Sequence, residues 1–121
     1  MYGIIEIMAS QTTVTVFTEP VLLTVSAVTE YTSPVNTTSI IKKCTICNST
    51  GTPATLTIYK IAAAGTAGAL NTITSARVVA SGATYEAFEI ENHVLLPGDF
   101  VQALSGTGAA LSFTMSGIQV V

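Results

Sequence analysis

The sequence predicts an all-β protein, an antiparallel β-sandwich of the jelly-roll type with about eight strands. Hydroxyl-bearing and apolar β-branched residues alternate with period 2 in several segments, as half-buried strands require. Turn-forming residues recur at short spacing between these segments, which is typical of sandwiches and jelly rolls. No convincing amphipathic helix interrupts the pattern.

The alternation is clearest in three segments, and we expect each of them to turn one face toward a shared dry interior. In the last segment, Leu111, Phe113 and Met115 share a face and should point inward. In the middle segment, Leu56 and Ile58 should do the same. The three segments are 13–16, 55–60 and 111–116.

Turn signals separate the strands. Pro97 fixes φ for the second position of a turn, and Gly98 can adopt the positive φ that follows in a type II turn. The Ala-rich stretch 61–70 contains Gly65 and Gly68, so we expect a flexible loop there, with a short helix as the alternative. The other turn signals lie at 33–34, 48–53, 81–82 and 105–108.

The chain of 121 residues has the length of one domain, and its first ten residues stand apart from the strand pattern. Residues 11–121 form the predicted sandwich domain. Residues 1–10 are either a first strand or an apolar arm that adds to a neighbour's sheet. The segment lacks the basic start of a signal peptide. The arm's candidate contacts with a partner are Ile4, Ile5, Ile7 and Met8.

Charged residues make up only 9% of the chain, against roughly a quarter in a typical soluble domain. A total of 20 Thr and 10 Ser takes their place, and the net charge is −3. Such an exterior suits a protein that packs against neighbours, although a monomer with a neutral surface is the alternative. The four basic residues are too few for nucleic-acid binding, and no apolar run is long enough to cross a bilayer.

Cys44 and Cys47 form a C-x-x-C pair, which in other contexts serves redox chemistry or zinc binding. Here the pair follows an apolar and basic stretch and precedes an Asn-Ser-Thr-Gly turn, which indicates a strand. Residues three apart on a regular strand point to opposite faces. We therefore expect buried structural thiols, with a disulfide or a metal or redox site as lesser alternatives.

The remaining polar residues indicate neither catalysis nor a metal site. His93 lies near Glu86 and Asp99, but the segment offers no cleft, so a hydrogen-bonded turn histidine is expected. Glu89 and Glu91 share a strand face and could form a weak calcium site, although a solvated strand end is the simpler interpretation. We predict no enzyme, no cofactor, no metal and no small-molecule substrate.

Segment 31–61, YTSPVNTTSIIKKCTICNSTGTPATLTIYKI, resembles a recurrent pattern in small structural proteins of tailed bacteriophages and prophages. In that pattern a Tyr-Thr-x-Pro-x-Asn-Thr-Thr turn leads into an Ile-Ile-Lys-Lys strand, then a Cys-Asn turn and a Thr-rich strand. The segment 83–121, with its Asn-His-x-Leu step and Pro-Gly-Asp turn, is similar to the second half of the pattern. These motifs are turn and strand motifs and carry no catalytic residue.

The resemblance implies a β-sandwich subunit of a virion that is assembled in the cytoplasm of a bacterial host. The leading prediction is a capsid decoration (cement) protein, a homo-oligomer and most simply a trimer, that binds across subunits of the major capsid protein. A neck, tail or head-fibre component is the first alternative. A receptor- or carbohydrate-binding module is the second, although sugar stacking needs exposed aromatic residues and the chain has no Trp.

Overall fold

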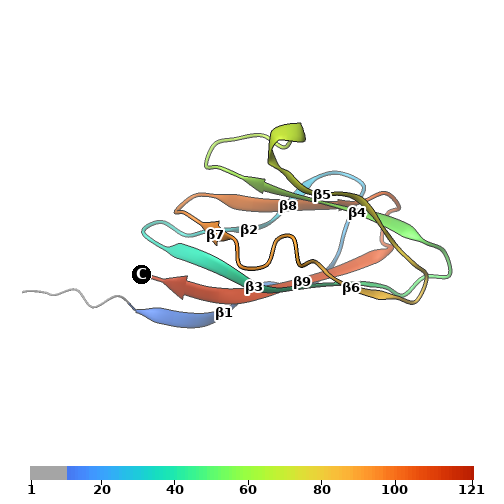
Figure 1. Ribbon diagram of the computed structural model, residues 1–121, viewed down its shortest axis with the longest axis horizontal. Coiled ribbons are helices and arrows are strands. Elements are labelled where there is room, and N and C mark those ends of the chain that lie inside the picture. The colour runs from blue at the N-terminus through green and yellow to red at the C-terminus, as the bar shows by residue number, and fades with distance from the viewer. Residues whose placement is uncertain (1–10) are drawn as a thin grey trace, which may run out of the picture.

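The computed structural model describes residues 11–121, which form two antiparallel β-sheets packed face to face (Figure 1). This confirms the predicted all-β sandwich. A single 3₁₀ turn, η1 (Ala69–Asn71), lies between the fourth and fifth strands. The strands are β1 (Thr12–Leu22), β2 (Val28–Thr32), β3 (Thr38–Asn48), β4 (Ala54–Ile61), β5 (Thr72–Val79), β6 (Thr84–Glu86), β7 (Val94–Leu95), β8 (Phe100–Ser105) and β9 (Leu111–Val120).

The strand order identifies the fold as a jelly roll. Sheet A has the order β1-β9-β3-β6, with β7 also paired to β3, and sheet B has the order β2-β8-β4-β5. The pairs are nested, because β1 pairs with β9, β2 with β8, β3 with β6 and β7, and β4 with β5. Since β6 and β7 are two pieces of one interrupted strand opposite β3, the sandwich has the eight strand positions of a jelly roll.

The interior is built from alternate residues of each strand, as the period-2 pattern predicts. Leu111, Phe113 and Met115 of β9 are fully buried, and so are Leu56 and Ile58 of β4. Each such side chain contributes about 1.5–3 kcal/mol when it leaves water, so strands of this kind drive the two sheets together.

The two valines of the first strand do not follow that prediction. Val14 and Val16 are 86% and 55% exposed, because the register with β9 places them opposite Ile118 and Ser116 on the outer side of sheet A. Period 2 establishes that two side chains share a face, but it does not establish which face meets the core. The expectation that segment 13–16 turns one dry face toward the shared interior was wrong.

The turn at Pro97 and Gly98 has the predicted type II geometry. Gly98 has φ +88°, and the amide of Asp99 donates to the carbonyl of Leu96 at 2.9 Å. The Asp99 carboxylate also accepts hydrogen bonds from the amide of Leu96 at 3.0 Å and from the amide of Ala63 at 3.1 Å. This one side chain therefore holds the loop after β4 against the turn before β8.

Stretch 61–70 contains the predicted loop. β4 ends at Ile61, and the 3₁₀ turn begins only at Ala69. The Asn71 side chain closes the loop, since it accepts from the amide of Gly68 and donates to the carbonyl of Thr66, both at 2.8 Å.

A chain of hydroxyl groups joins the two sheets at one end of the sandwich. Tyr31 of β2 contacts Ser39 of β3 at 2.8 Å and accepts a hydrogen bond from Gln119 of β9 at 2.7 Å. Ser39 in turn contacts Ser33 at 2.8 Å. The Tyr31 ring stacks on Phe17 of β1 with centroids 4.1 Å apart, so this aromatic pair links the sheets beside the hydroxyl network.

Candidate functional site

The predicted partner contacts Ile4, Ile5, Ile7 and Met8 lie outside the described residues, so their role stays a prediction. They precede β1, which forms one edge of sheet A. The described part of the chain offers three other places to examine: the cysteine pair, the surroundings of His93 with the glutamates, and the outer face of sheet A.

The cysteines lie on β3 and point to opposite sides of sheet A, as the three-residue spacing predicts. Cys44 is fully buried in the core, whereas Cys47 is half-buried, and its register partner Ser112 shares the outer face. Both thiols are free. Burial, with the nearby charges of Glu91 and Glu89, raises the pKa of the Cys44 thiol far above its ordinary value. A thiol in this state is a packing group rather than a nucleophile. The prediction of buried structural thiols therefore fits Cys44 fully and the half-buried Cys47 only in part.

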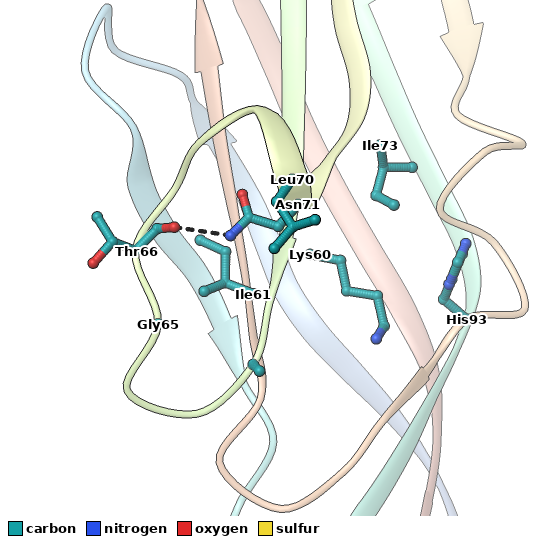
Figure 2. A pocket seen from close by; sticks show the side chains of 9 residues that line it. Lys60, Ile61, Gly65, Thr66, Leu70, Asn71, Ile73 and His93 are labelled. Carbon is teal, nitrogen blue, oxygen red and sulfur yellow. Dashed lines mark hydrogen bonds between the residues drawn. The ribbon is translucent and has the colours of Figure 1, made fainter.

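A cavity of about 520 Å³ opens beside His93 (Figure 2), so the expectation that no cleft lies near this residue was wrong. Lys60 from the end of β4 lines it together with the apolar side chains of Ile61, Leu70 and Ile73. The backbone amide of His93 donates to the carbonyl of Ile90 at 3.3 Å, which is the hydrogen-bonded turn that the sequence predicts.

Neither of the two carboxylates considered as catalytic partners of His93 lines this cavity. Glu86 forms an ion pair with Lys43 at 3.0 Å, and Asp99 holds the loop described above. The structure therefore does not bring the imidazole and either carboxylate together there. That the chain is not an enzyme stays a prediction.

Glu89 and Glu91 lie in the turns between β6 and β7, not on a strand as expected, and both bind groups of the protein itself. Glu89 accepts hydrogen bonds from Tyr85 at 2.5 Å and from Thr74 at 3.1 Å. Partial burial raises the pKa of Glu89, but these hydrogen bonds outweigh burial and leave its pKa below the ordinary value. Burial and the hydrogen bond that the Tyr85 hydroxyl donates to Glu89 raise the pKa of Tyr85 to about 12. Within residues 11–121 no group of three or more His, Cys, Asp or Glu side chains is arranged to hold a metal ion.

Glu91 has a structural role that the sequence did not reveal. Its carboxylate accepts a hydrogen bond from the backbone amide of Cys44 at 3.1 Å, in the gap between β6 and β7. It thus replaces the carbonyl that an uninterrupted strand would present to β3. Burial and the neighbouring Glu86 raise the pKa of Glu91 above its ordinary value. The hydrogen bond from the Cys44 amide acts in the opposite direction but does not cancel this shift.

Four apolar side chains lie side by side across the outer face of sheet A, and we call them the apolar row. Val14 of β1 lies opposite Ile118 of β9, Ile118 lies opposite Ile40 of β3, and Ile40 lies opposite Val94 of β7. Directly opposed residues in antiparallel strands share a face, so these four side chains cross the whole sheet side by side. Val14 and Val94 are 86% and 44% exposed, and Ile40 and Ile118 are half-buried.

This face carries little charge. Beside the apolar row, Val16 lies opposite Ser116, and Ser116 opposite Lys43, whose ammonium is paired with Glu86. On the other side of the row, Thr12 and Thr38 both lie opposite Val120. An apolar stripe flanked by hydroxyl groups and one internal ion pair makes this face the candidate contact surface among the described residues.

Comparison with known proteins defines no family. No protein-family model matches the chain, and a search of curated proteins gives no match. Among solved structures, the chain is similar to a chain of "Structure of infectious bursal disease virus Gx strain", with a TM-score of 0.48 and 13% identity. The match covers 93% of this chain and 31% of that one, so this protein spans less than a third of its length.

In the described part of the chain, no helix has the length and apolar character needed to cross a membrane. The fold and surface define the class of the protein as a jelly-roll domain with an apolar row across the outer face of one sheet.

Proposed function

We propose that this protein is a structural subunit of a virion, and more specifically a capsid decoration protein of a tailed bacteriophage. In this proposal it binds as a homo-oligomer, a trimer, across neighbouring subunits of the major capsid protein, in particles that assemble in the host cytoplasm. The observation that carries the proposal is the apolar row, which lies on an exterior where hydroxyl groups replace charges.

The proposed mechanism is physical. A rigid sandwich that contacts two or three capsid subunits at once adds binding free energy that must be overcome before those subunits separate. Apolar contact contributes about 25 cal/mol per Å² of buried surface, reduced by the cost of ordering the partners. Because many copies act on one lattice, modest contacts add up through avidity. Thr side chains around the apolar row suit such a contact, since they can be buried with less desolvation than charged ones.

The N-terminal segment supplies a second contact in this proposal. Ile4, Ile5, Ile7 and Met8 act as an anchoring arm that reaches a capsid subunit or a neighbouring copy. Deleting residues 1–8 and measuring binding to capsids that lack the protein tests the arm. Unchanged occupancy would remove the arm from the proposal without affecting the apolar row.

The first experiment is a count of copies in purified virions, by stained gel and by cryo-electron microscopy. A copy number close to that of the major capsid protein, at icosahedral positions, is the expected result. A few copies on the tail axis would support the neck, tail or head-fibre alternative instead. Absence from the particles would refute the virion proposal, and a clear hit on a glycan array would then favour a carbohydrate-binding module.

The second experiment tests the apolar row with a matched pair of variants. Val94→Lys places a charge in the row, whereas Val78→Lys places the same charge on an exposed strand of the other sheet; the two valines are 44% and 62% exposed. We expect V94K to reduce capsid occupancy strongly and V78K to leave it unchanged. Equal occupancy of both variants would show that the row is not the contact.

A further inference from the structure

Within residues 11–121, one half of β1 has an edge without a partner strand and with a regular pattern of backbone groups. Gln11 and Val121 exchange both of their backbone hydrogen bonds, at 3.2 and 2.9 Å. Hydrogen-bonded and non-hydrogen-bonded pairs alternate along an antiparallel ladder. The N–H and C=O groups of Thr12, Val14 and Val16 therefore point away from β9, and no described strand pairs with that edge.

This half-strand lacks the features that protect exposed strand edges from pairing. Such features are charges, proline, bulges and very short strands. In β1 all of them come later, with register shifts between Val16 and Thr18 and between Thr18 and Val21, followed by Glu19 and Pro20. The stretch TTVTV, residues 12–16, precedes them and contains no charge and no proline.

Every other sheet edge in the described residues carries at least one of these features. β2 has a register shift around Glu30, and β5 has register shifts, Arg77 and a positive φ of 44° at Ala76. β6 and β7 are three and two residues long. The first half of β1 is thus the one described edge that is both regular and uncharged.

We propose that this edge pairs with the same edge of a second copy, antiparallel and around a two-fold axis at Val14. Val14 then lies opposite Val14 of the second copy. Thr12 of each copy lies opposite Val16 of the other copy. Each facing pair exchanges two backbone hydrogen bonds, because all three residues direct their N–H and C=O groups to this edge. The two sheets A become one continuous sheet.

The apolar row supports a second copy as the occupant. Pairing at Val14 joins the row of one copy, which runs from Val94 through Ile40 and Ile118 to Val14, to the identical row of the other. A symmetric contact places like residues together, and that is unfavourable where they are charged. Here the facing side chains are threonine and valine, so two copies meet without repulsion. The continuous apolar face of the dimer is twice as long as that of one chain.

The test is the mass of the isolated full-length protein, by light scattering after gel filtration and by sedimentation equilibrium, with reductant present. We expect twice the 12.5 kDa chain mass, with a concentration-dependent dissociation into monomers. Val14→Pro removes an N–H that points to the free edge and leaves the ladder to β9 intact, a position where proline is tolerated. We expect V14P to weaken the dimer at least about thirtyfold, since two interchain hydrogen bonds are lost.

Val14→Lys is the second variant, because it places two ammonium groups opposite each other at the axis. Val78→Lys is its matched control on β5 and should remain dimeric. Circular dichroism and a thermal melt check that each variant is folded. A monomeric wild-type protein, or a dimer or trimer that persists in folded V14P and V14K, would overturn the proposal. Since no virion is present in these measurements, they test the two-fold pair without testing capsid binding, and a dimer in solution would replace the trimer of the proposed decoration role with a two-fold assembly.

Discussion

Gly117 of β9 occupies a position where a single methyl group should be costly. It lies between β1 and β3, opposite Thr15 and Ile41. A Cβ atom added there would lie 2.0 Å from the carbonyl oxygen of Ile40 and 2.8 Å from a ring carbon of Phe17. The obstacle is backbone in the centre of a sheet, so it cannot rotate away as a side-chain end could.

We expect Gly117→Ala to lower the free energy of unfolding by about 2 kcal/mol. Overpacking of this kind costs about 3 kcal/mol, and replacing glycine in an extended segment returns up to about 1 kcal/mol through the unfolded state. With a urea slope of about 1.5 kcal/mol per M, the midpoint of urea unfolding should fall by a little more than about 1 M. Fluorescence or circular dichroism reports the transition.

Gly68→Ala is the matched control. Gly68 has an extended backbone with φ −176°, and no atom lies within 4 Å of its added Cβ. The control substitution should leave the free energy of unfolding unchanged or raise it slightly. If G117A unfolds within about 0.3 M of the wild-type midpoint, the close approach of β3 to β9 at this point is wrong, and so is the placement of Ile40 in the apolar row.

Tyr31→Phe removes the hydroxyl that links the two sheets and should lower the free energy of unfolding by about 1–2 kcal/mol in urea titrations; an unchanged value would contradict the hydroxyl network. A thiol reagent should label Cys47 well before Cys44 in the folded protein, measured on the two single Cys→Ser variants, and equal rates would contradict the burial of Cys44. Glu89→Gln should lower stability at neutral pH. The depressed pKa of Glu89 stabilises the fold above its ordinary pKa of 4.5, and this contribution is lost as the pH falls through the folded-state pKa. The effect of E89Q should therefore vanish in acid, and a loss of equal size at every pH would contradict the assignment.

Much of the fold could be predicted because local chemistry and tertiary structure agree in most strands. In β9 and β4, alternation selects the buried residues directly. At Pro97 and Gly98, the turn residues match the backbone angles that the turn adopts. Such signals depend on a few neighbouring residues, so a single sequence contains them in full.

The remaining features depend on register between distant strands. Whether Val14 faces the core or solvent follows from its pairing with Ile118, about a hundred positions away in the chain, and no local pattern encodes this. The apolar row and the free edge of β1 were unpredictable for the same reason. Glu91 was missed because a carboxylate that completes a sheet ladder looks, in sequence, like any solvated acid.

The place of β9 in sheet A bears on how the protein is made. β9 lies between β1 and β3, and Val120 has both Thr12 and Thr38 as register partners. On the ribosome, the first and third strands therefore emerge long before the strand that unites them. Sheet A cannot close on a nascent chain before β9 has been made, so folding of the sandwich waits for this strand. Ribosomes stalled before Leu111 would carry chains open to proteases, whereas chains that include β9 would acquire protection in one step.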